Sequence, residues 1–93
     1  MTTVGFKFPE KIDHANVEAV LADALGMMKA MAKESLMVIN CQDLQSFDSS
    51  ALSMILSLKR QARMQLVDVQ LNAIPEKLAS LARVYGLSDV VLA

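Results

Sequence analysis

Three short apolar runs separated by amphipathic segments make up most of this chain. The runs cover residues 4–8, 36–41 and 66–71, and polar or turn-forming residues flank each of them. Apolar runs of this length are typical of β-strands. The middle run has the continuous apolar, centrally β-branched character of a strand that is buried on both faces of a sheet. Pro9 ends the first run and cannot donate a ladder hydrogen bond, so we expect that run to be an edge strand.

The segments between these runs have the periodicity of amphipathic helices. Helices are expected over residues 16–32, from Ser49 or Ser50 to about residue 64, and from Pro75 onward. Pro75 suits the first turn of a helix because its fixed φ matches the helical value. Gly86 follows the third helix at the position where a left-handed C-cap is usual. Residues 87–92 are expected to form a short strand or a turn of helix.

Each predicted helix has one apolar face that should pack on the sheet. In chain order, the three faces consist of Val17, Val20, Leu21, Ala24, Leu25, Met28 and Met31, then of Ala51, Met54, Ile55, Leu58 and Ala62, then of Leu78, Leu81, Ala82 and Tyr85. Methionines at helical spacing are interpreted as core residues that fill gaps. Gly26 lies inside the first helix and should weaken it by roughly 0.5–1 kcal/mol relative to alanine, unless close packing requires the missing side chain.

The alternation of strands and helices predicts one α/β domain over residues 1–93. Parallel neighbours in a sheet need a crossover connection, and the predicted helices supply one between each pair of strands. We therefore expect a mostly parallel four-stranded sheet with three or four helices. The sequence leaves open whether the helices cover one face of the sheet or both.

Composition and charge exclude several classes of protein. A hydrophobic content of 54% excludes a disordered chain, and no apolar stretch approaches the ~18 residues that span a bilayer. The N-terminal residues lack a basic region followed by an apolar core, which favours a cytoplasmic protein. A formal net charge of −1 gives no general attraction to nucleic acid. Cys41 is the only cysteine, which leaves no disulfide, and we expect it to be a buried, inert thiol.

Groups that could catalyse a reaction are scarce. His14 is the only histidine, and its place before the first helix favours a solvated or capping role. No Gly-rich phosphate loop is present, and no Cys/His spacing would hold a metal ion. We therefore expect a protein that is not an enzyme and that binds no cofactor and no metal.

The segment from Phe47 to Leu52 is the most informative part of the sequence. Asp48, Ser49 and Ser50 are all candidates for the N-cap of the second helix, where a side-chain oxygen accepts a hydrogen bond from a free backbone N–H. If one serine caps the helix, the other can point outward at the positive end of the helix dipole, as a contact point or a phosphoacceptor.

The second helix also carries a mixed outer stripe. At 100° per residue, the side away from the core contains Ser49, Ser53, Leu56, Arg60 and Arg63. Leu52 and Leu56 are expected to be exposed on its flank, where small and apolar residues would let a partner approach closely. Lys59, Arg60 and Arg63 form a basic end, which either complements the helix dipole and stays solvated or lies at the rim of an interface.

Together, the order of elements and the entrance to the second helix resemble a STAS domain, the fold of bacterial anti-sigma factor antagonists and of regulatory modules of transporters. The resemblance begins at Lys11-Ile12-Asp13-His14 and continues through Asp48-Ser49-Ser50-Ala51-Leu52. It implies that Ser49 is the regulatory hydroxyl, which a partner kinase phosphorylates in the antagonists. Two features depart from the family pattern: Ala51 replaces the usual glycine, and the segment before Lys11 is short for the family's opening pair of strands.

Within the family, the chain is most similar to the small STAS subunit (MlaB-type) of the Mla phospholipid transporter. The motifs that carry this similarity are Gln61-Ala62-Arg63, Pro75-Glu76-Lys77-Leu78, Leu81-Ala82 and Tyr85-Gly86-Leu87. The similarity implies a subunit that binds and supports a cytoplasmic ABC ATPase and is peripheral to the inner membrane only through that partner.

On that hypothesis, the partner-binding residues are Ser49, Leu52, Ser53, Leu56 and Arg60. The alternative hypothesis is an anti-sigma factor antagonist that binds a kinase and is switched by phosphorylation of Ser49. A third hypothesis, a domain that binds a small molecule, rests only on the Met-rich first helix.

Overall fold

Strands and helices alternate along the chain, as the periodicity predicts, in a computed structural model that describes residues 2–92. The elements are β1 (Thr3–Lys7), β2 (Lys11–Ile12), α1 (Val17–Lys29), β3 (Leu36–Asn40), β4 (Ser46–Phe47), α2 (Ser50–Gln65), β5 (Asp68–Asn72), α3 (Glu76–Val84) and α4 (Ser88–Val91). The last segment is therefore a turn of helix and not a strand. Gly86 has a φ of 71°, which confirms the left-handed C-cap after α3.

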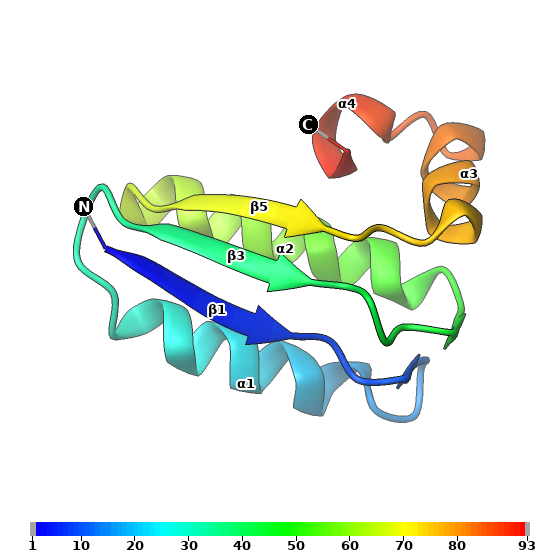
Figure 1. Ribbon diagram of the computed structural model, residues 1–93, viewed down its shortest axis with the longest axis horizontal. Coiled ribbons are helices and arrows are strands. Elements are labelled where there is room, and N and C mark those ends of the chain that lie inside the picture. Colours follow the sequence, from blue (N-terminus) through cyan, green and yellow to red (C-terminus); the bar gives the residue numbers. More distant parts are fainter. Residues whose placement is uncertain (1, 93) are drawn as a thin grey trace.

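The main sheet has three parallel strands in the order β1-β3-β5 (Figure 1). Its register places Val4 beside Met37, and Met37 beside Val69. The prediction that the first strand is an edge strand is confirmed. The fourth strand of the predicted sheet is absent from residues 2–92, and the two-residue strands β2 and β4 pair in a separate parallel ribbon.

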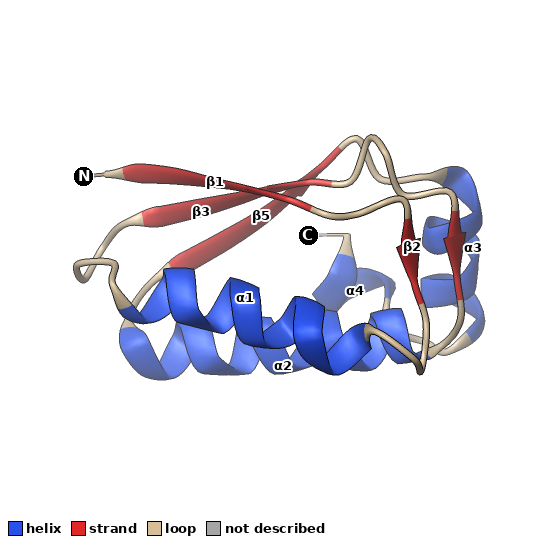
Figure 2. Cartoon of the chain, turned by 90° about the horizontal axis from the view of Figure 1, so that it is seen from below, coloured by secondary structure: helices blue, strands red, loops and turns tan. Residues whose placement is uncertain are grey.

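All helices near the sheet lie on one side of it. Figure 2 shows α1 and α2 along one face of the three strands, and no helix of the described chain on the opposite face. Met37 and Ile39 of β3 point into the helical layer and are fully buried, whereas Leu36 and Val38 are only partly buried. The expectation that the middle strand is buried on both faces is therefore wrong, because its alternate side chains lie on the uncovered face.

The core lies between the sheet and the helices. Its largest fully buried hydrophobic side chains are Phe8, Ile12, Met28, Met37, Ile39, Met54, Ile55, Leu58, Leu78 and Val91. Met27 of α1 and Met31, just after it, pack against this cluster. The methionines of this segment therefore offer no separate support for a small-molecule site. Tyr85 is 57% exposed because α3 has ended at Val84, which corrects its assignment to the apolar face.

Cys41 lies at the end of β3 and is fully buried. Burial raises the pKa of its thiol to about 11, so the reactive thiolate is scarce at neutral pH. The prediction of a buried cysteine is confirmed. Within residues 2–92, no helix has both the length and the hydrophobicity to cross a membrane.

Candidate functional site

The ribbon of β2 and β4 brings the entrances of α1 and α2 together. Lys11 pairs with Ser46, and Ile12 with Phe47. The backbone N–H of Asp48 donates to the carbonyl oxygen of Ile12 at 3.3 Å. Both helices therefore start at the same end of the molecule, beyond the carboxyl ends of β1 and β3 (Figure 1).

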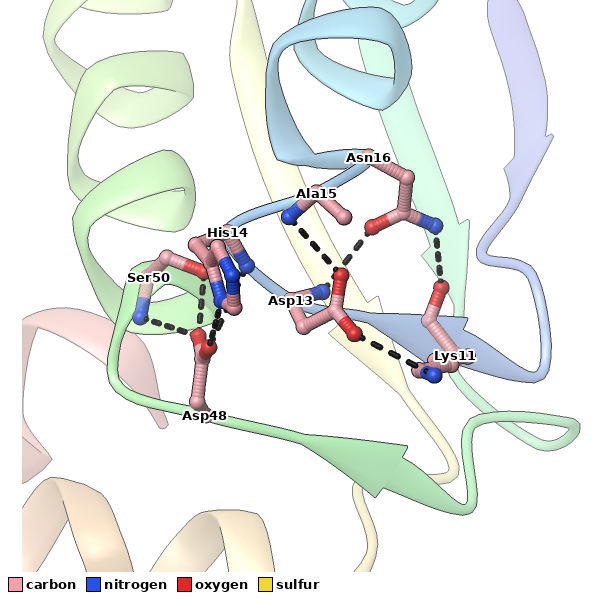
Figure 3. Close-up of polar contacts among 7 residues, drawn as sticks. All are labelled: Lys11, Asp13, His14, Ala15, Asn16, Asp48 and Ser50. Atoms are coloured by element: carbon pink, nitrogen blue, oxygen red, sulfur yellow. Dashed lines mark hydrogen bonds and ion pairs between the residues drawn. The ribbon is translucent and has the colours of Figure 1, made fainter.

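Asp48 joins the two helix entrances through its carboxylate (Figure 3). Its Oδ1 accepts a hydrogen bond from the Ser50 backbone N–H at 2.9 Å and another from the Ser50 hydroxyl. Its Oδ2 accepts a hydrogen bond from the His14 backbone N–H at 3.2 Å, with the His14 Nδ1 atom 3.5 Å away. Hydrogen bonds from the Ser50 hydroxyl and the Ser50 N–H, followed by those from His14, lower the pKa of Asp48 to about 2.

The entrance of α1 is held by a second set of short-range contacts. Asp13 Oδ1 accepts from the Ala15 N–H at 2.9 Å, and the Asp13 N–H donates to Asn16 Oδ1 at 2.9 Å. The Asn16 amide in turn donates to the Lys11 carbonyl at 2.7 Å. The hydrogen bond from Ala15, together with nearby Lys11, lowers the pKa of Asp13. The loop between β2 and α1 is thus a fixed platform beside the start of α2 (Figure 3).

The two adjacent serines have different environments. Ser50 is partly buried, and its hydroxyl is held by Asp48. Ser49 occupies the N-cap position of α2, but its side chain makes no capping hydrogen bond and is exposed. The carboxylate of Asp48 therefore satisfies a first-turn N–H, which confirms one of the three capping candidates, and neither serine caps the helix. Of the two serines, Ser49 is the one that points outward, and Ser50 is the more enclosed one.

The outer stripe of α2 is exposed for most of its length. Ser49, Ser53, Arg60 and Arg63 are exposed, and Leu56 is half-buried. Leu52 is only 3% exposed and belongs to the core cluster. Its assignment to the exposed flank is therefore wrong, and its side chain is not part of the surface that a partner would meet. The surface that remains is a serine-rich half followed by a basic half.

A shallow groove of about 160 Å³ runs beside this stripe, between α1 and α2. Val17, Glu18, Leu21, Ser50, Ser53, Met54 and Ser57 line it. The sequence predicts neither the α1 residues nor Ser57 as part of the site. Periodicity could not reveal them, because it gives the faces of each helix and not which helices are neighbours.

The described residues offer no candidate metal centre. Residues 2–92 contain no group of three or more His, Cys, Asp or Glu side chains that could hold a metal ion. His14 is exposed, and its contact with Asp48 is a local one at the start of the helices. The geometry of the site, an exposed hydroxyl above a fixed helix start with a stripe of small and basic residues behind it, is suited to contact with a macromolecule.

A family model described as "Mlab, STAS domain" matches residues 9–92 of this chain. The chain belongs to the STAS-domain family. The predicted resemblance, including its MlaB-type character, is thereby confirmed. Membership of this family supports a protein-interaction role, of the general kind served by anti-sigma factor antagonists.

A solved structure supports the fold independently. The crystal structure of a sulfate transporter family protein from Wolinella succinogenes matches this STAS domain with a TM-score of 0.70, and the match covers 96% of this chain and 70% of that chain. The two sequences are 9% identical, so the similarity is one of fold. No curated protein matches this sequence.

Proposed function

We propose that this STAS domain is a non-enzymatic subunit that binds and supports the cytoplasmic ATPase of an ABC-type phospholipid transporter, in the maintenance of lipid asymmetry. The observation that carries the proposal is the exposed hydroxyl of Ser49, which makes no capping hydrogen bond and lies at the N-terminal end of the exposed stripe on α2. The MlaB-type family match is what favours a transporter ATPase as the partner.

In this proposal the contact is made by Ser49, Ser53 and Leu56, with Arg60 at the rim. Two small hydroxyl side chains one helical turn apart allow a partner to approach the backbone of α2 closely. Leu56 supplies apolar area, and the guanidinium of Arg60 can form planar, two-point hydrogen bonds with a carboxylate. The protein would then be cytoplasmic and would be held at the inner membrane by its partner.

A second candidate function is a phosphorylation-switched antagonist of an anti-sigma factor kinase. The same exposed hydroxyl supports it, because a phosphate on Ser49 would lie at the positive end of the α2 dipole. The neighbouring Asp48 carboxylate would repel that phosphate and push it outward, so phosphorylation would change the surface that a partner meets.

Substitution of Ser49 tests the docking proposal. Ser49→Glu places a charge where the partner must remove water, so binding to a co-expressed MlaB-type transporter ATPase should weaken by several kcal/mol, while the free energy of unfolding changes by less than about 1 kcal/mol. Gln70→Glu adds the same charge on the uncovered face of the sheet and should leave binding intact. Pull-downs paired with thermal melts make the comparison. Full binding by the Ser49→Glu variant would refute the docking proposal.

Ser49→Ala separates the two candidate functions. A constitutive transporter subunit should tolerate the loss of one hydroxyl group with a small drop in affinity. An antagonist with this substitution would bind its kinase permanently, and phosphorylation that releases the wild type would not release the variant. Kinase-dependent release of the wild type alone would therefore favour the second candidate.

A further inference from the structure

Positive charge is concentrated at the end of the molecule opposite to Ser49. The last turn of α1 and the loop after it, residues 29–34, lie beside the C-terminal half of α2 and its exit, residues 59–68 (Figure 1). The Gln65 side chain donates to the Met28 carbonyl at 2.7 Å, and the Glu34 N–H to the Leu66 carbonyl at 2.7 Å. These contacts fix the two segments as one surface, which we call the basic pole.

The basic pole carries five basic and two acidic side chains, a net charge of +3 in a chain of net charge −1. The five basic residues are Lys29, Lys33, Lys59, Arg60 and Arg63. The ion pairs found within residues 2–92 use none of them. The remainder of the chain has a net charge of −4, so positive charge is concentrated in the basic pole and negative charge in the rest of the protein.

Two apolar side chains project from the same pole. Met64 is 74% exposed and Leu66 is 60% exposed, among the most exposed large hydrophobic residues of the described chain. Leu66 also has a left-handed backbone, with a φ of 60°, at the helix C-cap position where glycine or asparagine is usual. A leucine here is unfavourable for folding twice over, through backbone strain and through apolar exposure. A residue that is unfavourable for folding in this way is a candidate for contact with another molecule.

Two of the basic residues share a groove with Leu66. Lys59 and Arg63 line an open groove of about 640 Å³ with Leu66, and Ala62, Val67 and Val69 form its apolar part. The acidic residues Glu34 and Asp68 line the groove on the side of the loop and β5. Long cationic side chains around a projecting apolar tip are the arrangement by which peripheral proteins contact anionic bilayers, since the cations reach the headgroups while the apolar groups enter the interface.

We propose that the basic pole binds directly to an anionic phospholipid surface, with Leu66 and Met64 in the interfacial layer and the basic side chains other than Arg60 among the headgroups. The opposite signs of the pole and of such a surface provide the long-range attraction. The contact adds to any association through a partner and does not depend on the proposed ATPase. Because it uses few apolar groups, it is weak and salt-sensitive.

Vesicle co-sedimentation of the full chain tests this proposal. Vesicles of phosphatidylcholine containing about one third phosphatidylglycerol should retain the wild type at low salt, and pure phosphatidylcholine vesicles should not. Arg63→Ala should lower the partition coefficient about fivefold. Leu66→Gly should lower it about tenfold while leaving the Tm unchanged or raising it, because glycine relieves the left-handed strain.

Matched controls lie on α3, at a different end of the molecule (Figure 1). Val84 is 81% exposed, so Val84→Ser removes an apolar side chain that is more exposed than Leu66. Lys77→Ala removes an exposed cation that none of the ion pairs of residues 2–92 uses. Both variants should bind vesicles like the wild type. Absence of wild-type binding to anionic vesicles, or equal losses in the control variants, would overturn the proposal and leave an acidic protein as the partner of this pole.

Discussion

At the scale of single residues, Asp48 is the side chain on which the candidate site depends. It fixes the first turn of α2 through Ser50 and ties it to His14 at the start of α1. Ser49 is left exposed because its neighbour makes the capping contact. The carboxylate of Asp48 thereby fixes the helix start that carries the Ser49 hydroxyl, which makes no capping hydrogen bond itself.

The titration of Asp48 should be visible in the stability of the protein. Its folded pKa of about 2 lies below the usual value of 3.8, so its contribution to stability is present above pH 3.8 and is lost as pH falls toward 2. Asp48→Asn keeps an oxygen that can accept the capping hydrogen bond but has no charge to titrate. Thermal melts from about pH 5 to pH 2 should show a smaller decrease in Tm for the variant. Parallel profiles would show that the carboxylate contributes nothing.

Leu52 shows what sequence reasoning could not resolve at this scale. On a helical wheel it lies between the apolar and polar faces of α2, so periodicity allows either environment. The structure buries it at 3% exposure within the core cluster. Ser49 and Ser53 lie well inside the polar face, and their exposure could be predicted. Side chains at the edge of a helix face depend on which neighbour packs there, and a single sequence does not contain that information.

At the scale of elements, the long helices could be predicted because each has several turns of apolar periodicity, and the main strands because each contains an apolar run of strand length. The two-residue strands β2 and β4 could not, since two residues show no period. Yet this ribbon places Asp48 beside His14. The β2–β4 ribbon, which could not be predicted from the sequence, is therefore the part of the fold that assembles the candidate site.

Gly26 in α1 provides a test of how closely the helices pack. It is exposed, and a Cβ built at this position would meet no heavy atom within 4 Å. Gly26→Ala should therefore raise the free energy of unfolding by roughly 0.5–1 kcal/mol, because alanine loses less backbone entropy in a helix. Gly86→Ala is the matched contrast: it also has open space, but its φ of 71° strains alanine, and stability should fall. Urea denaturation measures both, and a destabilised Gly26→Ala would contradict open packing around α1.

At the scale of the whole molecule, the sequence of β3 did not predict that helices cover only one face of the sheet. Its alternate residues Met37 and Ile39 are buried while Val38 is half-buried, but all of them are apolar and the sequence does not distinguish them. This arrangement places α1 and α2 side by side and exposes the outer stripe of α2 from one end of the molecule to the other.

The two ends of that stripe should act independently. Ser49 and Met64 are fifteen residues apart on one helix, roughly 22 Å at 1.5 Å per residue, which exceeds the Debye length of about 8 Å at physiological salt. Ser49→Glu should therefore prevent pull-down of the ATPase without changing the binding of anionic vesicles. Leu66→Gly should weaken vesicle binding without changing the pull-down, and the double variant should show both losses with no additional loss of stability. If either single substitution reduced both kinds of binding while its Tm stayed at the wild-type value, the two surfaces would be one, and the assignment of separate partners to the two ends of α2 would be wrong.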